Sequence, residues 1–328
     1  MKKSELSKGR RIIRAADRTV DTIVLILLIL MLMFGIYSLV DSKLVYMSAD
    51  ASNYEEYKPA ENDSKSFAEL QRINPEVFGW LTIIGTEVDY PVCQAEDNDK
   101  YVNTNAMGEY SLVGSLFLDF RNRQDFSDFN SIIYGHHMEQ DKLFGCFDKY
   151  RDAGFLKEHS RANLYFGGKK HGVELFAFIV ADAYDYDYYT VCGETSSAEA
   201  RQAYLDHIMQ TALTTLPAEV TTDDRLIVLS TCSEDITNGR FILVGKLTDK
   251  PFKEPEKAKK RTGLGLGNSD SLLSRIPVWQ TAVLLAIAAL MLVYAVSLAA
   301  DRLRKRRKNS TDTKDKKHVN EGNTTDRQ

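Results

Sequence analysis

The chain has 328 residues, 42 of them Lys or Arg and 46 Asp or Glu, which gives a formal net charge of −4. Its length suits one or two domains, and 44% hydrophobic with 27% charged residues excludes wholesale disorder. Four cysteines are too few for a disulfide-built scaffold. Charge is segregated: residues 1–41 hold seven basic and four acidic side chains (+3), and 277–328 hold ten and five (+5), which leaves 25 and 37 (−12) between them. An acidic body argues against nucleic acid as a partner.

Two long uncharged runs explain this segregation. The first is the 19 residues 22–40 and the second is the 25 residues 276–300. At about 1.5 Å per residue, each is long enough as a helix to cross a hydrocarbon core of about 30 Å. Basic residues precede the first run and follow the second, so the positive-inside rule predicts a two-pass cell-membrane protein with both termini cytoplasmic. The alternative for the first run is a cleaved signal peptide, for which the run is too long.

Composition divides the rest of the chain. The body between the runs is predicted to be extracellular, with a polar stalk before its folded domain and a flexible Lys/Pro/Gly-rich linker after it. The predicted order is a basic cytoplasmic N-terminus at 1–21, a transmembrane helix at 22–40, the stalk at 41–64, the folded domain at 65–247, the linker at 248–275, a transmembrane helix at 276–300 and a basic, disordered cytoplasmic tail at 301–328.

The folded domain is predicted to be mainly β. Short runs rich in β-branched and aromatic residues, bounded by turn residues, predict eight strands, at 78–84, 88–93, 115–120, 131–134, 162–166, 173–181, 225–230 and 240–247. Three helices are expected, at 66–73 with Ser66 as its cap, near 141–149, and at 197–213. Many strands with few helices indicate an antiparallel β-barrel with helical decoration.

Cys232 and Arg240 are the first candidates for chemistry. Cys232 follows one strand and Arg240 begins the next, with seven residues between them, so the two strands are expected to be antiparallel neighbours with these residues side by side at a barrel rim. An arginine there would favour the thiolate and would offer hydrogen-bond donors to an oxyanion. The alternative is a small buried hydrophobic residue beside a surface arginine.

His136 strengthens the catalytic interpretation. It follows strand 131–134 through Gly135, so it lies at a strand end where it can reach the same rim and act as a general acid and base. The alternative is that His136 and His137 are exposed loop histidines or ligands of an adventitious metal. Three strand-end residues of these types favour catalysis, although spacing alone does not establish their proximity.

The chain resembles the sortases, membrane-anchored cysteine transpeptidases of Gram-positive bacteria, and most closely class B. The motifs that carry this resemblance are INPEVFGWLTIIGTEVDYPVCQAEDN (73–98), GSLFLDFRN (114–122), FNSIIYGHHM (129–138), LFGCFDKY (143–150) and LSTCSEDITNGRFILVGKL (229–247). They extend over essentially the whole folded domain. The resemblance implies a closed sortase-type β-barrel and a Cys–His–Arg site, with Cys232 as nucleophile, His136 as general acid and base, and Arg240 stabilising oxyanion and substrate.

The family also implies a substrate class. Class B sortases cleave a C-terminal sorting signal of an NPxTx kind after its threonine and transfer the acyl group from a Cys thioester to an amine. The expected partners are therefore secreted proteins that bear such a signal, an amine on peptidoglycan precursor or pilin, and the cell membrane. No cofactor and no metal are expected. Ser230 and Thr231, which precede the nucleophile, are candidates to hydrogen-bond substrate, with packing within the strand as the alternative.

Two features depart from the family pattern. Val228 replaces the threonine of the usual TLxTC motif, inside a strand, where it should not affect the chemistry. A second membrane span is more typical of pilin-polymerising sortases, so pilin assembly is an alternative to cell-wall anchoring. A catalytically idle module that binds cell-wall proteins and a hydrolytic cysteine peptidase are further alternatives.

Several other residues have two interpretations. Glu234 and Asp235 either orient His136 or are solvated loop charges. The run 182–189 alternates Asp with aromatic residues, which fits a strand or substrate wall better than a calcium site. Cys93, Cys146 and Cys192 have no evident partner pattern, and a disulfide among them stays open.

Overall fold

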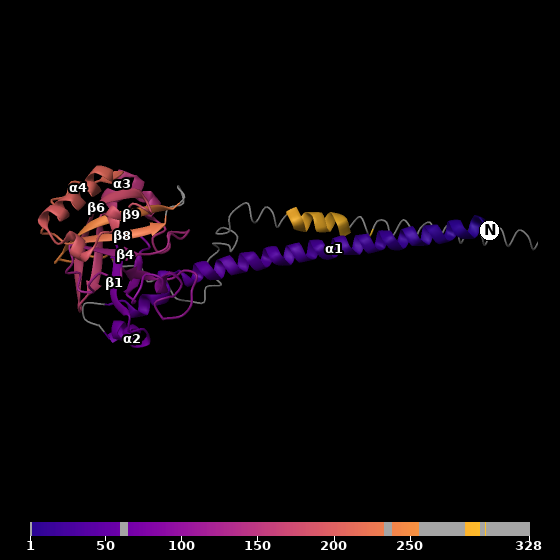
Figure 1. Ribbon diagram of the computed structural model, residues 1–328. Helices are drawn as coiled ribbons and strands as arrows, with labels where there is room; N and C mark the ends of the chain where they lie inside the picture. Colours follow the sequence, from indigo (N-terminus) through magenta and orange to yellow (C-terminus); the bar gives the residue numbers. More distant parts are fainter. Residues whose placement is uncertain (1, 60–64, 233–237, 256–285, 296–298, 300–328) are drawn as a thin grey trace, which may run out of the picture. The chain divides into compact units, whose positions relative to one another are not determined.

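The computed structural model describes residues 2–59, 65–232, 238–255, 286–295 and 299. The chain separates into two compact units: residues 44–260 form one, and residues 1–43 with 261–328 form the other. The first unit, called the barrel unit below, contains every strand found in the described residues (Figure 1). The candidate chemistry therefore lies in the barrel unit.

Eight strands of the barrel unit close on themselves. Hydrogen-bonded neighbours follow the order β5-β1-β2-β3-β4-β8-β9-β6, and β6 pairs again with β5, so no edge is left open. The short strand β7 is added outside this ring, beside β6. The bounds are β1 (Val77–Ile83), β2 (Asp89–Cys93), β3 (Leu116–Leu118), β4 (Asn130–Tyr134), β5 (Arg161–Phe166), β6 (Lys169–Asp182), β7 (Thr214–Thr215), β8 (Leu226–Cys232) and β9 (Gly239–Thr248).

The closed, mainly β architecture is as predicted, and each of the eight predicted strands is present. The expectation of a purely antiparallel barrel is wrong, because β2 pairs with β3 and β4 pairs with β8 in parallel. Parallel neighbours need long crossover connections. The segments between β2 and β3 and between β4 and β8 supply these connections. The additional strand β7 was not predicted, because two residues are too short to give a sequence signal.

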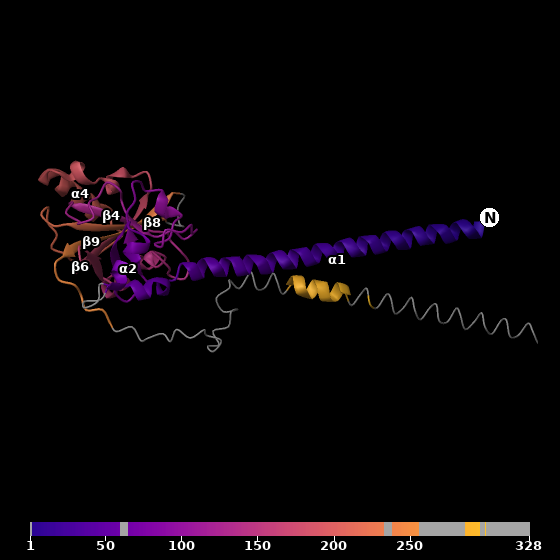
Figure 2. The ribbon, with the colours of Figure 1, turned by 90° about the horizontal axis from the view of Figure 1, so that it is seen from below.

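Helices cover the barrel on different sides (Figures 1 and 2). α2 begins at Lys65, so Ser66 lies inside its first turn and is not its cap. α4 begins after Ser197, whose hydroxyl accepts a hydrogen bond from the Ala200 amide. The helix predicted near 141–149 is instead a short 3₁₀ turn followed by α3. The helix bounds are η1 (Ala51–Tyr57), α2 (Lys65–Ile73), η2 (Lys100–Val102), η3 (Phe147–Arg151), α3 (Ala153–Glu158), η4 (Tyr186–Tyr189), η5 (Cys192–Thr195) and α4 (Ala198–Thr211).

Two buried clusters hold the barrel unit together. The first draws side chains from all eight ring strands, and the second lies between α4 and strands β4, β6, β8 and β9. Strand β8 contributes Ile227 and Leu229 to the first cluster, and Leu226 and Val228 to the second. Both faces of β8 are therefore buried, which explains its continuous apolar run. This rigid strand leads directly to Cys232.

The folded unit extends beyond the predicted bounds of 65–247. Before it, Ala49 and Tyr54 are buried in the first cluster, and the Ala49 carbonyl accepts a 2.8 Å hydrogen bond from the Tyr90 hydroxyl. After it, Asn163 bonds the backbone of Phe252 through both ends of its amide. The predicted stalk and the start of the predicted linker therefore pack on the barrel. Their polar composition concealed the few buried side chains that attach them.

The N-terminal apolar run lies within α1 (Lys2–Ser48), the one described helix that is long and apolar enough to cross a membrane. Its large side chains are exposed, including Met33 and Phe34. Most of the second predicted span, 276–300, lies outside the described residues. Its described part is a shorter apolar helix, Ala286–Ala295.

Candidate active site

Strand register brings the three predicted catalytic positions to one end of the barrel. β8 and β9 are antiparallel, and Cys232 is paired with Arg240. β4 and β8 are parallel, and Tyr134 is level with Ser230. His136 lies two residues beyond Tyr134, and Cys232 lies two residues beyond Ser230. The chain thus reaches His136, Cys232 and Arg240 at the same level of three adjacent strands.

Gly135 makes this arrangement possible. Its amide donates a 3.2 Å hydrogen bond to the Ser230 carbonyl, which extends the β4–β8 pairing by one residue. A Cβ atom at this position would lie 2.4 Å from Leu116 Cδ2 and 2.9 Å from Phe144 Cδ2. A larger residue would have to push the chain away from these side chains. The glycine before His136 is therefore required by packing.

A cleft of about 760 Å³ opens at this end of the barrel. His136, Arg240 and the two residues before Cys232 all line it. Its lining residues are Asn98, Val102, Phe117, Arg121, Tyr134, Gly135, His136, Ala183, Tyr186, Tyr189, Thr190, Glu194, Ser230, Thr231 and Arg240. The volume is within the range of ordinary ligand sites, and aromatic and charged groups share its walls.

His136 is half-buried, and its Nε2 lies 2.9 Å from the Val102 carbonyl oxygen. Arg240 is also half-buried, and its Nη1 donates to the Gly239 carbonyl at 3.0 Å. His137 is not part of the cleft lining, and its ring contacts Phe241 with the centroids 5.7 Å apart. The two neighbouring histidines thus have different surroundings, and only the first is exposed to a ligand in the cleft.

The predicted substrate contacts Ser230 and Thr231 both line the cleft. The Ser230 hydroxyl lies 3.1 Å from the Tyr189 hydroxyl in a shared hydrogen bond. Glu234 and Asp235, which either orient His136 or are solvated loop charges, lie outside the described residues.

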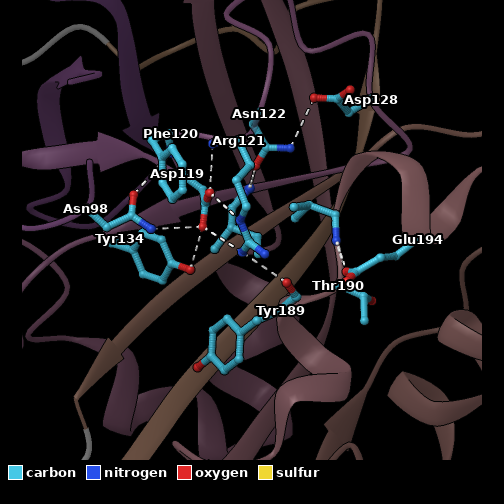
Figure 3. Close-up of polar contacts among 12 residues, drawn as sticks. Asn98, Asp119, Phe120, Arg121, Asn122, Asp128, Tyr134, Tyr189, Thr190 and Glu194 are labelled. Atoms are coloured by element: carbon cyan, nitrogen blue, oxygen red, sulfur yellow. Dashed lines mark hydrogen bonds and ion pairs between the residues drawn. The ribbon is translucent and has the colours of Figure 1, made fainter. Parts of the chain in front are cut away.

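Two residues that no sequence pattern singled out, Asp119 and Arg121, form an ion pair beside the cleft. Asp119 is fully buried, and its carboxylate accepts hydrogen bonds from Arg121, from Asn98 Nδ2 at 3.1 Å and from the Tyr134 hydroxyl at 3.0 Å (Figure 3). Burial raises the pKa of this carboxyl, but the Arg121 hydrogen bonds outweigh burial and hold the pKa below its usual value. The LFLDFRN segment contains this ion pair, and the Asp-x-Arg spacing was its only sequence signal.

The aromatic–acidic run 182–189 ends in η4, and Tyr186 and Tyr189 line the cleft. A wall of the cleft was one of its two predicted roles, and a strand was the other. Asp185 and Asp187 approach His207 of α4, with ligand-type atoms of all three within 4.8 Å of one another. Among the described residues, these three side chains are close enough together to share a metal ion. None of the three lines the cleft.

Two of the remaining cysteines are unsuited to nucleophilic chemistry. Cys93 and Cys146 are free thiols and are buried. Burial raises the pKa of each to about 12, so both stay protonated near neutral pH. Because both are free thiols, the structure has no disulfide between Cys93 and Cys146.

The chain is similar to known sortases. Sortase B of Listeria monocytogenes is 38% identical over 184 residues, which are 56% of this chain and 74% of the relative. Sortase B of Staphylococcus aureus is 28% identical over 237 residues, which are 69% of this chain and 96% of the relative. No protein-family model matches the chain.

Solved structures agree with this relationship. A mutant form of Clostridium perfringens sortase B has a TM-score of 0.57 at 30% identity, covering 62% of this chain and 98% of that one. A Staphylococcus aureus sortase B–substrate complex scores 0.55 at 25% identity, covering 64% and 96%. A Streptococcus pyogenes class B sortase involved in pilus biogenesis scores 0.52 at 36% identity, covering 55% and 97%.

Proposed function

Because this chain belongs to the sortase B family of cysteine transpeptidases, we propose that it cleaves an NPxTx-like C-terminal sorting signal after threonine and transfers the acyl group to an amine on peptidoglycan precursor. The observation that carries the proposal is the strand register, which brings positions 136, 232 and 240 to one end of the barrel. The cleft beside them supplies a surface for the peptide. A related sortase B has been solved as a substrate complex, which supports peptide binding in this fold.

In the proposed first step, the Cys232 thiolate attacks the backbone carbonyl carbon of the threonine residue. A C–S bond forms, and the carbonyl oxygen becomes an oxyanion. The backbone of Arg240 is paired across the strands with that of Cys232, and its guanidinium donates hydrogen bonds to this oxyanion. Protonated His136 then gives its proton to the departing amine as the C–N bond breaks, which leaves a thioester.

In the second step, an incoming primary amine attacks the thioester carbon. Neutral His136 accepts the proton that the amine loses, and the C–S bond breaks to release the Cys232 thiolate. His136 is thus returned to its protonated state, and the amide product leaves. The position of His136 on the cleft wall suits it to both transfers.

Pilin assembly is a second candidate function. The Streptococcus pyogenes relative, a class B sortase involved in pilus biogenesis, is 36% identical to this chain. The acceptor amine would then belong to a pilin subunit, and the chemistry would be otherwise the same. We also propose that α1 anchors the enzyme in the cell membrane and that its barrel unit is extracellular, because α1 is long and apolar enough to cross a bilayer and basic residues precede its apolar run.

The direct test is to incubate the full chain in detergent with sorting peptides and to identify products by mass. The peptides should differ at the first and fourth positions of NPxTx, and the acceptors should include triglycine, a pilin-like lysine peptide and water alone. We expect cleavage after threonine and transfer to one amine in preference to water. Preference for triglycine would support wall anchoring, and preference for the lysine peptide would support pilin assembly. Cleavage with hydrolysis alone would contradict the transpeptidase assignment for this chain.

A further inference from the structure

The wall of the cleft is fastened at three consecutive backbone carbonyls. The Tyr188 carbonyl accepts a 3.0 Å hydrogen bond from the hydroxyl of Tyr204 on α4. The Tyr189 carbonyl accepts one from Arg121 Nη2 at 3.1 Å. The Thr190 carbonyl accepts one from the amide of Asn130 on β4. Three different parts of the fold thus hold this segment, which has no strand partner of its own.

The side chain of Tyr189 is held as firmly as its backbone. Its ring stacks on Tyr134 with the centroids 6.3 Å apart and the planes inclined by 21°. Its hydroxyl lies 3.1 Å from the hydroxyl of Ser230, two residues before Cys232. Tyr189 therefore links the cleft wall to the strand that ends at the proposed nucleophile. A shift of residue 189 would change the shape of the cleft beside Ser230.

Arg121 is the one of the three carbonyl donors that itself lines the cleft. Its Nε bonds Asp119 Oδ1 at 2.9 Å, and its Nη2 bonds Asp119 Oδ2 at 3.0 Å. The same Nη2 reaches the Tyr189 carbonyl, so the guanidinium lies between the buried carboxylate and the wall (Figure 3). Asp119 also accepts the Tyr134 hydroxyl, which fixes the ring on which Tyr189 stacks. One buried carboxylate thus orients two of the groups that hold Tyr189, Arg121 and Tyr134.

We propose that Arg121 is a positioning residue for the sorting peptide: held by Asp119, it fixes Tyr189 and so preorganises the cleft wall. This inference rests on the proposed function. A preformed wall saves the cost of ordering the segment when the peptide binds, so its loss raises KM. The strand pairing that positions residues 136, 232 and 240 does not involve Arg121, so kcat should change little.

The test compares Arg121→Gln, Arg121→Lys and Arg123→Gln in the full chain in detergent. Arg123 is an exposed arginine two residues away that is not in the cleft lining, so its replacement controls for the loss of one positive charge. Peptide cleavage gives KM and kcat for each variant. The rate at which iodoacetamide alkylates Cys232, followed by mass spectrometry, measures the reactivity of the nucleophile without any need for peptide binding.

We expect Arg121→Gln to raise KM by about tenfold or more, the effect of losing one charged hydrogen bond, while kcat stays within about threefold. Arg121→Lys should show the same defect, because an ammonium group lacks the planar fork that bonds Asp119 and the wall together. Arg123→Gln should have the KM and kcat of the unaltered chain. Every variant should have its Cys232 alkylated at the rate of the unaltered chain.

Three results would overturn the inference. An unchanged KM in Arg121→Gln would show that the wall does not need this arginine. Full rescue by lysine would show that only its charge matters. A parallel loss of Cys232 alkylation would show that Arg121 supports the whole site. If the unaltered chain cleaves no sorting peptide, the proposed function itself fails and the inference falls with it.

Discussion

His136 and His137 are adjacent in the chain but differ in what their side chains contact. His136 lines the cleft, whereas the ring of His137 packs against Phe241 outside the cleft lining. His136→Ala should therefore lower turnover by about 10²–10⁴-fold, the usual range for loss of a positioned acid–base group. His137→Ala should cost much less. Steady-state cleavage of a sorting peptide measures both, and a larger loss at His137 would move the proposed acid–base role to that residue.

Arg240 offers a second residue-scale test. Its backbone is paired with that of Cys232, and its guanidinium is half-buried at the cleft. Lysine keeps the positive charge but loses the planar set of donors that can bond substrate and oxyanion together. Arg240→Lys should therefore reduce kcat/KM by at least about 100-fold. Cleavage assays check this, with Arg123→Lys as a matched control, and near-normal turnover would restrict Arg240 to a diffuse electrostatic or structural role.

The location of residues 136, 232 and 240 at strand ends could be predicted from the sequence, because each lies within two residues of the end of an apolar strand. The Asp119–Arg121 pair could not, because its significance depends on Tyr189, which is 68 residues further along the chain from Arg121. A short Asp-x-Arg spacing gives no indication that a distant carbonyl completes the arrangement. Contacts that connect distant loops are thus the part of the site that only the structure supplies.

At the scale of elements, a group of charged side chains connects the first and last segments of the barrel unit's sequence. Lys58, which follows η1, bonds Glu254, which follows β9, at 2.7 Å, and Asp89 of β2 at 2.9 Å. Glu254 also bonds Lys170 of β6 at 3.1 Å. Burial raises the pKa of Glu254, but the hydrogen bonds from Lys58 and Asn163 outweigh it and lower the pKa below its usual value.

This network predicts a pH-dependent loss of stability in Glu254→Gln. The folded-state pKa of Glu254 is below its unfolded value, so its contribution is complete above about pH 4.5 and is lost as pH falls further. We expect the variant to lose about 2 kcal/mol of unfolding free energy at pH 7 and much less below pH 4. Urea unfolding at both pH values measures this, with exposed Glu158→Gln as control. An equal loss at both pH values would contradict the ion-pair account.

The same elements show where sequence patterns end. Strands β1, β6 and β9 could be predicted because their buried residues form long apolar runs. The attached segments 49–57 and 251–255 could not, because each contributes only a few buried or bonded residues, such as Tyr54 and Glu254, within polar sequence. The parallel pairing of β4 with β8 was also missed, since a strand's composition does not reveal its neighbour. That pairing is what brings His136 level with Cys232.

At the scale of the whole molecule, we predict that both chain termini are cytoplasmic and that the barrel unit between the two apolar runs is extracellular. Single cysteines introduced as Ser42→Cys, Ser271→Cys or Ser310→Cys, in a chain without its four native cysteines, test this on intact cells. An impermeant thiol reagent should label positions 42 and 271 but not 310, because basic residues border the outer flanks of both apolar runs. Permeabilised cells control for reactivity at position 310. Labelling of that position on intact cells would refute the two-pass topology.

The central claim is that Cys232 carries the acyl group between the peptide and the amine. The most direct measurement is the intact mass of the full chain in detergent after mixing with a sorting peptide and no amine, followed by fragmentation to locate the adduct. We predict a mass increase equal to the peptide's acyl portion, located on Cys232, discharged by added triglycine and absent from Cys232→Ala. The same adduct on Cys232→Ala, or cleavage by the unaltered chain with no adduct that triglycine discharges, would contradict the account.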